Sequence, residues 1–95
     1  MSASAYPIAK FRLGHIVSTP NALSQLTQED ILIGIKRHQA GDWGEISTED
    51  AQANVQALRE GGRLLSVYHS AKGVKFYLIT EADRSKTTIL LPQEY

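Results

Sequence analysis

The chain has 95 residues, which predicts one domain with a single modest hydrophobic core. Apolar residues make up 42% of it and charged residues 21%, proportions typical of a soluble globular domain. Its 10 basic and 10 acidic side chains cancel, which argues against a protein that binds nucleic acid mainly by neutralising phosphates.

The residue types also exclude several kinds of chemistry. With no cysteine, disulfides and thiolate chemistry are ruled out. The histidines, His15, His38 and His69, are too scattered for a metal-ligand pair at helical spacing, and we expect no metal and no cofactor. No apolar run approaches the ~18 residues of a membrane helix, and the N-terminus lacks the regions of a signal peptide. We therefore expect a cytoplasmic protein without a membrane partner.

The first half of the chain predicts one strand and three helices. We expect residues 1–10 to be a loose lead-in and residues 11–18 to be a strand, weakened by Gly14. Helix-capping patterns then recur, because Ser or Thr accepts a backbone hydrogen bond at a helix start and glycine suits a helix end. The expected helices run from Pro20 to about Gln25, from Thr27 to Gly41, and from Ser47 to Gly61.

The second half predicts three antiparallel strands, over residues 63–69, 74–80 and 87–91, with a hairpin loop at residues 70–73. Pro92 ends the last strand. The whole chain is therefore expected to be a single α+β domain, residues 1–95. Its N-terminal strand and helices would pack on one face of a C-terminal antiparallel β-meander.

Alternation along these strands divides their side chains into two faces. The face expected to pack against the helices, together with the helical residues that meet it, comprises Ile31, Ile35, Val55, Leu58, Leu65, Val67, Phe76 and Leu78. The opposite face would carry Arg63, Ser66, Tyr68, Lys75 and Tyr77. Such an open face suits RNA or the acidic surface of a partner, but it also suits simple contact with water.

Two short segments carry more polar chemistry than the fold requires, and residues 37–44 are the first. His38 lies at a helix end, where it is either a general acid with a raised pKa or a cation that binds the last carbonyls. Asp42 is expected to form an Asx turn, and Trp43 is either a hydrophobic plug or an anchor for a partner.

The second polar segment is the turn at residues 81–86. Arg84 is expected to pair with Glu81 or Asp83 and so fix the turn. Alternatively these side chains form a functional loop, since binding groups concentrate on loops held by rigid strands.

The two polar segments and their spacing resemble a known group of proteins. The pattern comprises Arg37-His38-x-x-Gly41-Asp42-Trp43-Gly44, residues 62–68 (GRLLSVY) and residues 79–95 (ITEADRSKTTILLPQEY). It resembles a family of small, largely uncharacterised proteins carried by bacterial plasmids, phages and integrated elements. The resemblance covers most of the chain from Leu13 onward and implies an accessory protein of a mobile genetic element.

The order of elements also resembles, more weakly, the layout of barnase-like ribonucleases and related toxin nucleases. Those enzymes cleave RNA on a sheet face with a general base, a general acid and one or two arginines on the phosphate. The resemblance implies Glu81 or Asp83 as base, His38 as acid, and Arg63 and Arg84 on the phosphate. The turn where a histidine acid would be expected carries Glu81, Asp83 and Arg84 instead.

The sequence therefore supports two hypotheses. In the first, the chain is a non-catalytic binding or inhibitor module that acts on a protein or nucleoprotein partner. Its candidate binding residues are Asp42, Trp43, Ser66, Tyr68, Lys75, Tyr77, Arg84 and Thr87. In the second, it is a ribonuclease-type enzyme. The two differ in whether His38, Arg63 and a carboxylate of the turn converge on one small cleft.

Overall fold

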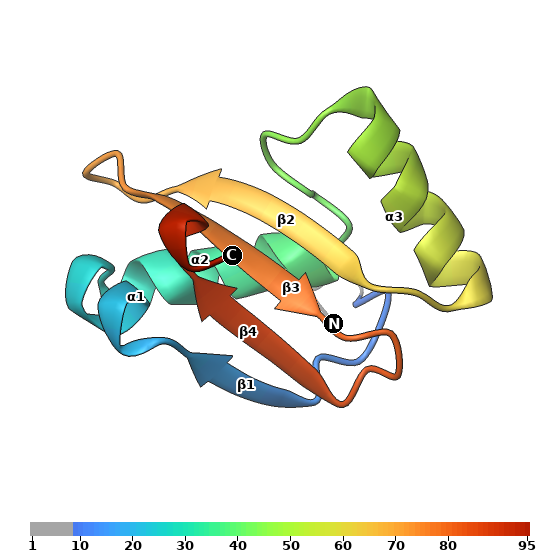
Figure 1. The fold of residues 1–95 in the computed structure, drawn as a ribbon, viewed down its shortest axis with the longest axis horizontal. Helices are drawn as coiled ribbons and strands as arrows, with labels where there is room; N and C mark the ends of the chain where they lie inside the picture. The colour runs from blue at the N-terminus through green and yellow to red at the C-terminus, as the bar shows by residue number, and fades with distance from the viewer. Residues whose placement is uncertain (1–8) are drawn as a thin grey trace, which may run out of the picture.

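The computed structural model describes residues 9–95; most of the expected lead-in, residues 1–8, lies outside the described residues. The elements are β1 (His15–Ser18), α1 (Pro20–Gln25), α2 (Gln28–Gln39), α3 (Thr48–Glu60), β2 (Leu64–His69), β3 (Lys75–Thr80), β4 (Lys86–Leu90) and the short 3₁₀ helix η1 (Pro92–Glu94). The fold is α+β, as predicted. Figure 1 shows α2 behind the sheet, α3 beside β2, and η1 in front.

The three α-helices begin and end as local capping patterns predict. The Thr19, Thr27 and Ser47 side chains each accept a backbone N–H of the first helical turn, and Thr27 with Asp30 forms a full capping box. Gly41 and Gly61 follow α2 and α3 with positive φ, which terminates a helix without steric cost. No helix in residues 9–95 has the length and hydrophobicity needed to cross a membrane.

The sheet is mixed, which corrects the expectation that β1 packs on a face of the meander. Strand order is β1-β4-β3-β2, with β1 parallel to β4 and the other pairs antiparallel. β1 is also shorter than the strand expected over residues 11–18. Gly14, with φ +66°, ends the extended segment on the N-terminal side of β1. A Cβ at Gly14 would lie 2.3 Å from the Ser85 carbonyl, so glycine lets this bend approach the chain next to β4.

The predicted face of β3 is confirmed, but that of β2 is inverted. In the hairpin, Tyr68 lies opposite Phe76, and Ser66 lies opposite Leu78. Ser66 and Tyr68 are therefore on the helix-covered face and are buried, whereas Leu65 and Val67 are on the other face with Tyr77. Because β2 has apolar residues on both faces, its sequence does not show which face packs against the helices. The pairing register with β3 determines that face.

The core has two clusters. The larger one lies between α1, α2 and the sheet, with Phe76, Leu78 and Ile89 at its centre and Ile31 and Ile35 packed against it. The smaller one joins α3 to the sheet through Trp43, Ala57 and Leu64, with Leu58 packed against them. Val55, expected in the core, is 50% exposed instead. The helix that carries it, α3, stands beside β2 and does not cover a face of the sheet (Figure 1).

The outer edge of β2 is closed by hydrogen bonds. Asn54 on α3 donates to the Leu65 carbonyl at 2.7 Å and accepts from the Leu65 N–H at 3.1 Å. One step along, Val67 N–H donates to the Trp43 carbonyl, and Val67 C=O accepts from Glu45 N–H. Gly44 permits this contact, because a Cβ there would lie 2.0 Å from the Val67 oxygen. An unpaired strand edge is thereby protected from association with other chains.

The first prediction tests the core. Phe76→Ala should lower the free energy of unfolding by about 3 to 5 kcal/mol, since the ring is buried and its removal leaves a cavity. Val55→Ala, at an exposed helical position, should change it by less than ~0.5 kcal/mol. Urea denaturation followed by circular dichroism measures both. Equal stability of the two variants would contradict the position given to Phe76.

Candidate functional site

His38, the only candidate general acid, lies inside the protein. Its side chain has no exposed surface. Its Nδ1 is hydrogen-bonded to the Ser66 hydroxyl and its Nε2 to the Thr80 hydroxyl, at 2.8 Å. Both ring nitrogens are thus occupied, and neither is directed toward a solvent-accessible substrate.

The surroundings of His38 keep its ring neutral. Burial, reinforced by the charge of Arg84, lowers the pKa of His38 from 6.5 to about 4. The sequence hypothesis of a pKa raised by the helix C-terminus is therefore wrong, because the cost of burying a charge exceeds the attraction of the last carbonyls. Phe11 and Trp43 pack edge-on against the ring, which explains its separation from water.

Arg84 fixes the β3–β4 turn, but not through carboxylates as expected. Its Nη1 donates to the carbonyls of Gly62, Glu81 and Ala82 at 2.6, 3.0 and 3.1 Å. Its Nη2 donates to the Ala57 carbonyl near the end of α3, at 3.0 Å. The guanidinium therefore joins the turn to the C-terminus of α3, where a cation is favoured. Arg84 also has φ +62°, an uncommon conformation for a residue with a Cβ.

The other candidate catalytic residues lie around this turn. Arg63 and Glu81 form a surface ion pair at 3.7 Å. Asp83 accepts the Ser85 N–H at 3.0 Å, and hydrogen bonds from the side chain and the backbone of Ser85 lower the pKa of its carboxyl. Arg63 and Glu81 are thus brought together, but His38 is held in the interior by its two hydroxyl partners.

The candidate binding residues divide into buried and accessible groups. The buried ones are Trp43, Ser66, Tyr68 and Thr87. Lys75 is exposed and Tyr77 is half-buried under Tyr95, whose ring meets it edge-on at 5.4 Å. Asp42 is exposed and accepts both guanidinium hydrogen bonds of Arg37, at 2.7 and 3.2 Å. Arg37 in turn lowers the pKa of Asp42.

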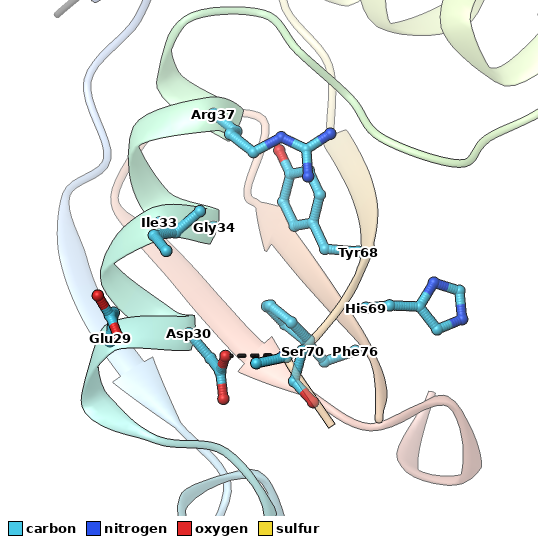
Figure 2. Close-up of a pocket in the computed structure, with 10 residues that line it drawn as sticks. Glu29, Asp30, Ile33, Gly34, Arg37, Tyr68, His69, Ser70 and Phe76 are labelled. Atoms are coloured by element: carbon cyan, nitrogen blue, oxygen red, sulfur yellow. Dashed lines mark hydrogen bonds between the residues drawn. The ribbon is translucent and has the colours of Figure 1, made fainter. Parts of the chain in front are cut away.

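A pocket, which we name the α2–β2 pocket, lies between α2 and β2. Its volume is about 280 Å³, and its lining is more apolar than polar. Phe76 and Tyr68 form its floor, and Ile33 stands at its rim (Figure 2). Gly34 lets α2 approach this floor closely, because a Cβ at this position would lie 3.1 Å from the Phe76 ring.

Polar contacts connect α2 with the β2–β3 hairpin at one end of the pocket and with Tyr68 of β2 at the other. At one end Asp30 accepts the Ala71 N–H at 3.1 Å and so ties the hairpin loop to α2 (Figure 2). At the other, the Arg37 guanidinium lies over the Tyr68 ring, 4.5 Å from its centroid. The Tyr68 hydroxyl donates to the Asp42 carbonyl, and burial raises the pKa of Tyr68. A preformed hollow of this kind is typical of a binding site.

The charges on the pocket rim are unequally balanced. Arg37 is paired with Asp42, and His69 lies 3.1 Å from Glu45. Asp30 is held by backbone N–H groups, which lower its pKa, and so it stays ionised. Glu29, on the first turn of α2, makes no ion pair with any residue in the described part of the chain. The rim therefore presents uncompensated negative charge beside an apolar floor.

Sequence reasoning did not find this pocket. Its one local signal is a glycine inside a well-capped helix, which usually marks a close approach or a missing side chain. Its floor depends on Tyr68 facing α2, and the inverted assignment of β2 placed Tyr68 on the opposite side. No group of three or more His, Asp and Glu side chains in residues 9–95 is arranged to hold a metal ion.

Comparison with known proteins adds no relative. No protein-family model matches the chain, and neither a curated protein nor a solved structure gives a match.

The second prediction follows from the buried His38. The folded state holds its pKa near 4 and the unfolded chain near 6.5, so only the unfolded state gains a proton as pH falls between these values. Stability should therefore decrease by roughly 2 kcal/mol from about pH 7 to about pH 5. The carboxylates with lowered pKa values lose their contribution to stability only near or below about pH 4.5, outside this window.

Urea denaturation at several pH values measures this loss, and His38→Gln should remove most of the dependence. An NMR titration should find the His38 ring neutral at about pH 5. A ring that titrates near 6.5 would contradict the buried position.

The third prediction concerns Arg84. Arg84→Lys should lower the free energy of unfolding by about 1 to 3 kcal/mol, because a single ammonium cannot reach the carbonyls on both sides of the turn. Arg63→Lys is the matched control: its exposed ion pair should be worth less than ~0.5 kcal/mol. Thermal or urea denaturation decides between them, and equal effects would argue against a bridging role for Arg84.

Proposed function

We propose that this chain is a small, non-catalytic accessory protein of a mobile genetic element, active in the cytoplasm, that binds a protein or nucleoprotein partner through the α2–β2 pocket. The observation that carries the proposal is the apolar hollow over Phe76 and Tyr68, which Gly34 also lines. The motif pattern described above supports the connection with mobile elements.

The position of His38 supports binding rather than catalysis. General-acid catalysis needs a group with a pKa near the working pH next to the leaving atom. His38 is neutral, buried and bonded at both nitrogens, and Arg84 is committed to backbone carbonyls. The barnase-like hypothesis needs both side chains at a common cleft, so the geometry favours the binding module.

The chemistry of the pocket indicates the kind of segment that the partner presents. A bulky apolar side chain fits the aromatic floor, where its burial supplies most of the binding energy. A lysine or arginine next to it would lie beside Glu29 and Asp30, matching the negative rim. The partner is therefore a protein that inserts one apolar anchor flanked by a basic residue.

The fourth prediction tests this contact by crosslinking. A photo-reactive phenylalanine analogue in place of Ile33 should capture one discrete protein in cells that naturally carry the chain. The same analogue in place of Val55 should not, although Ile33 and Val55 are both 50% exposed. Once the partner is identified, Glu29→Lys should weaken its binding about fivefold, or ~1 kcal/mol, by reversing the rim charge.

Glu49→Lys is the matched control, because Glu49 occupies the first turn of α3 as Glu29 occupies that of α2. It should leave the affinity within about twofold. Equal capture at Ile33 and Val55 would contradict the pocket as the binding site. Cleavage of RNA by the purified chain, lost on His38→Ala, would instead support the ribonuclease hypothesis.

A further inference from the structure

The two outer edges of the sheet differ in how their backbone groups are hydrogen-bonded. The β2 edge is closed by Asn54 and by residues 43–45, as described above. β1 is the terminal strand on the opposite side, and no described strand lies beyond it (Figure 1). Along β1 the outward backbone is therefore not covered by any described strand.

The pattern of hydrogen bonds to β4 identifies which backbone groups are free. His15 N–H donates to the Ser85 carbonyl and Thr19 N–H to the Ile89 carbonyl, so the odd-numbered residues of this segment face β4. In a parallel ladder, the N–H and C=O of the alternate residues point to the other side. The backbone groups of Ile16 and Ser18 therefore point away from the sheet, ready to pair with another strand.

Apolar side chains border this free edge on both faces of the sheet. Ile16 is 48% exposed and Val17 is 40% exposed, an unusual degree of exposure for adjacent β-branched residues of a strand. Leu32 of α2 is 50% exposed. Leu32 lies two helical turns before Gln39, on the same side of α2. The Gln39 side-chain amide donates to the Phe11 carbonyl at 3.1 Å, so this side of α2 meets the segment that precedes β1. Leu32 therefore lies on the side of α2 that faces the segment leading into β1.

The charge around the edge is positive, although the whole chain is neutral. Residues 9–28 contain no Asp or Glu, and Arg12 is exposed there. Lys86, also exposed, lies opposite His15 in the β1–β4 register. A shallow hollow lined by Arg12, His15, Ile16, Gln39 and Arg84, among others, contains no carboxylate.

The nearest carboxylates have partners of their own. Asp83 accepts the Ser85 N–H, and Glu81 pairs with Arg63. Glu94, beyond the C-terminal end of β1, accepts hydrogen bonds from Thr19 and Asn21. The positive charge at the N-terminal half of the edge is therefore left for an external group.

We propose that the outer edge of β1 binds an extended, acidic segment of a partner protein, which extends the four-stranded sheet by one strand. Backbone pairing with Ile16 and Ser18 supplies the register. Alternate apolar side chains of the segment cover Val17 on one face of the sheet, and its carboxylates face Arg12, which lines the same hollow as Ile16, on the other. A second copy of this chain is a poorer occupant, because two-fold pairing would bring the same basic surface against itself. The site is separate from the α2–β2 pocket.

The experiment uses the full chain and a fluorescent, end-capped seven-residue peptide of alternating glutamate and valine. Its binding is measured by fluorescence anisotropy and by NMR of the ¹⁵N-labelled protein. We expect the largest amide shifts, and new protection from hydrogen exchange, at Ile16 and Ser18. A peptide with lysine in place of glutamate should bind at least about tenfold more weakly.

Matched variants separate the edge from general charge effects. Arg12→Glu should weaken binding of the glutamate peptide about tenfold, whereas Arg59→Glu on α3, with the same change in net charge, should leave it within about twofold. Ile16→Pro removes the outward N–H and should abolish binding. If that variant does not fold, Ile16→Asp retains the backbone and should also abolish binding through repulsion.

Several outcomes would overturn the inference. They are no binding of the glutamate peptide, equal binding of the lysine peptide, amide shifts confined to the α2–β2 pocket, or a dimer formed through β1 in sedimentation. None of them bears on the proposed function, which is read out by crosslinking at Ile33.

Discussion

A buried chain of hydrogen bonds centred on His38 determines how the rest of the structure fits together. It runs from Ser66 on β2 through His38 on α2 to Thr80 on β3. Thr80 is bonded to Thr87 on β4, and Thr87 donates to the Leu13 carbonyl before β1. One polar path thus fixes α2 against the meander and holds the N-terminal segment in place. No buried side-chain nitrogen or oxygen in residues 9–95 lacks a hydrogen-bond partner, so the buried polar groups of this chain of hydrogen bonds are all satisfied.

Residues that suggest catalysis in the sequence serve architecture in the folded protein. A histidine between two hydroxyls and an arginine among backbone carbonyls are costly to bury unless every hydrogen bond is made. Once made, those bonds specify the packing of α2 and α3 against the sheet more strictly than apolar contacts do. Among the polar groups that remain accessible are Glu29 on α2 and Arg12 before β1, which the two proposed binding sites use.

The sequence predicted what local interactions decide. A helix cap depends only on residues that are close in the chain. The predicted caps at Thr19, Thr27 and Ser47 and the predicted glycines after α2 and α3 are all confirmed. The three-strand meander is confirmed for the same reason: its turns are short. What failed is which face of β2 the helices cover and how β1 pairs with β4, and neither follows from local sequence. Leu64 and Leu65 are equally apolar, so nothing local indicates which of them faces the helices.

The candidate site shows the same limit. Burial of Ser66 and Tyr68 follows from the β2–β3 register, in which they oppose Leu78 and Phe76. The carbonyl partners of Arg84 include Ala57, 27 positions earlier in the chain. No sequence pattern predicts such a contact. The α2–β2 pocket could be inferred only after Gly34, Tyr68 and Phe76 were known to meet.

The pairing of β1 with β4 has a consequence for how the protein is made. β1, the first strand of the sheet in chain order, pairs with β4, which is synthesised after the other three strands of the sheet, and the Thr19–Glu94 hydrogen bond closes a separation of 75 positions. Loops of this length form slowly, because their closure entropy is lost before any contact compensates for it. While the ribosome is still making the meander, β1 has no native partner and both of its edges are free. A chaperone or an early-binding partner that covers this one segment would therefore control when folding finishes.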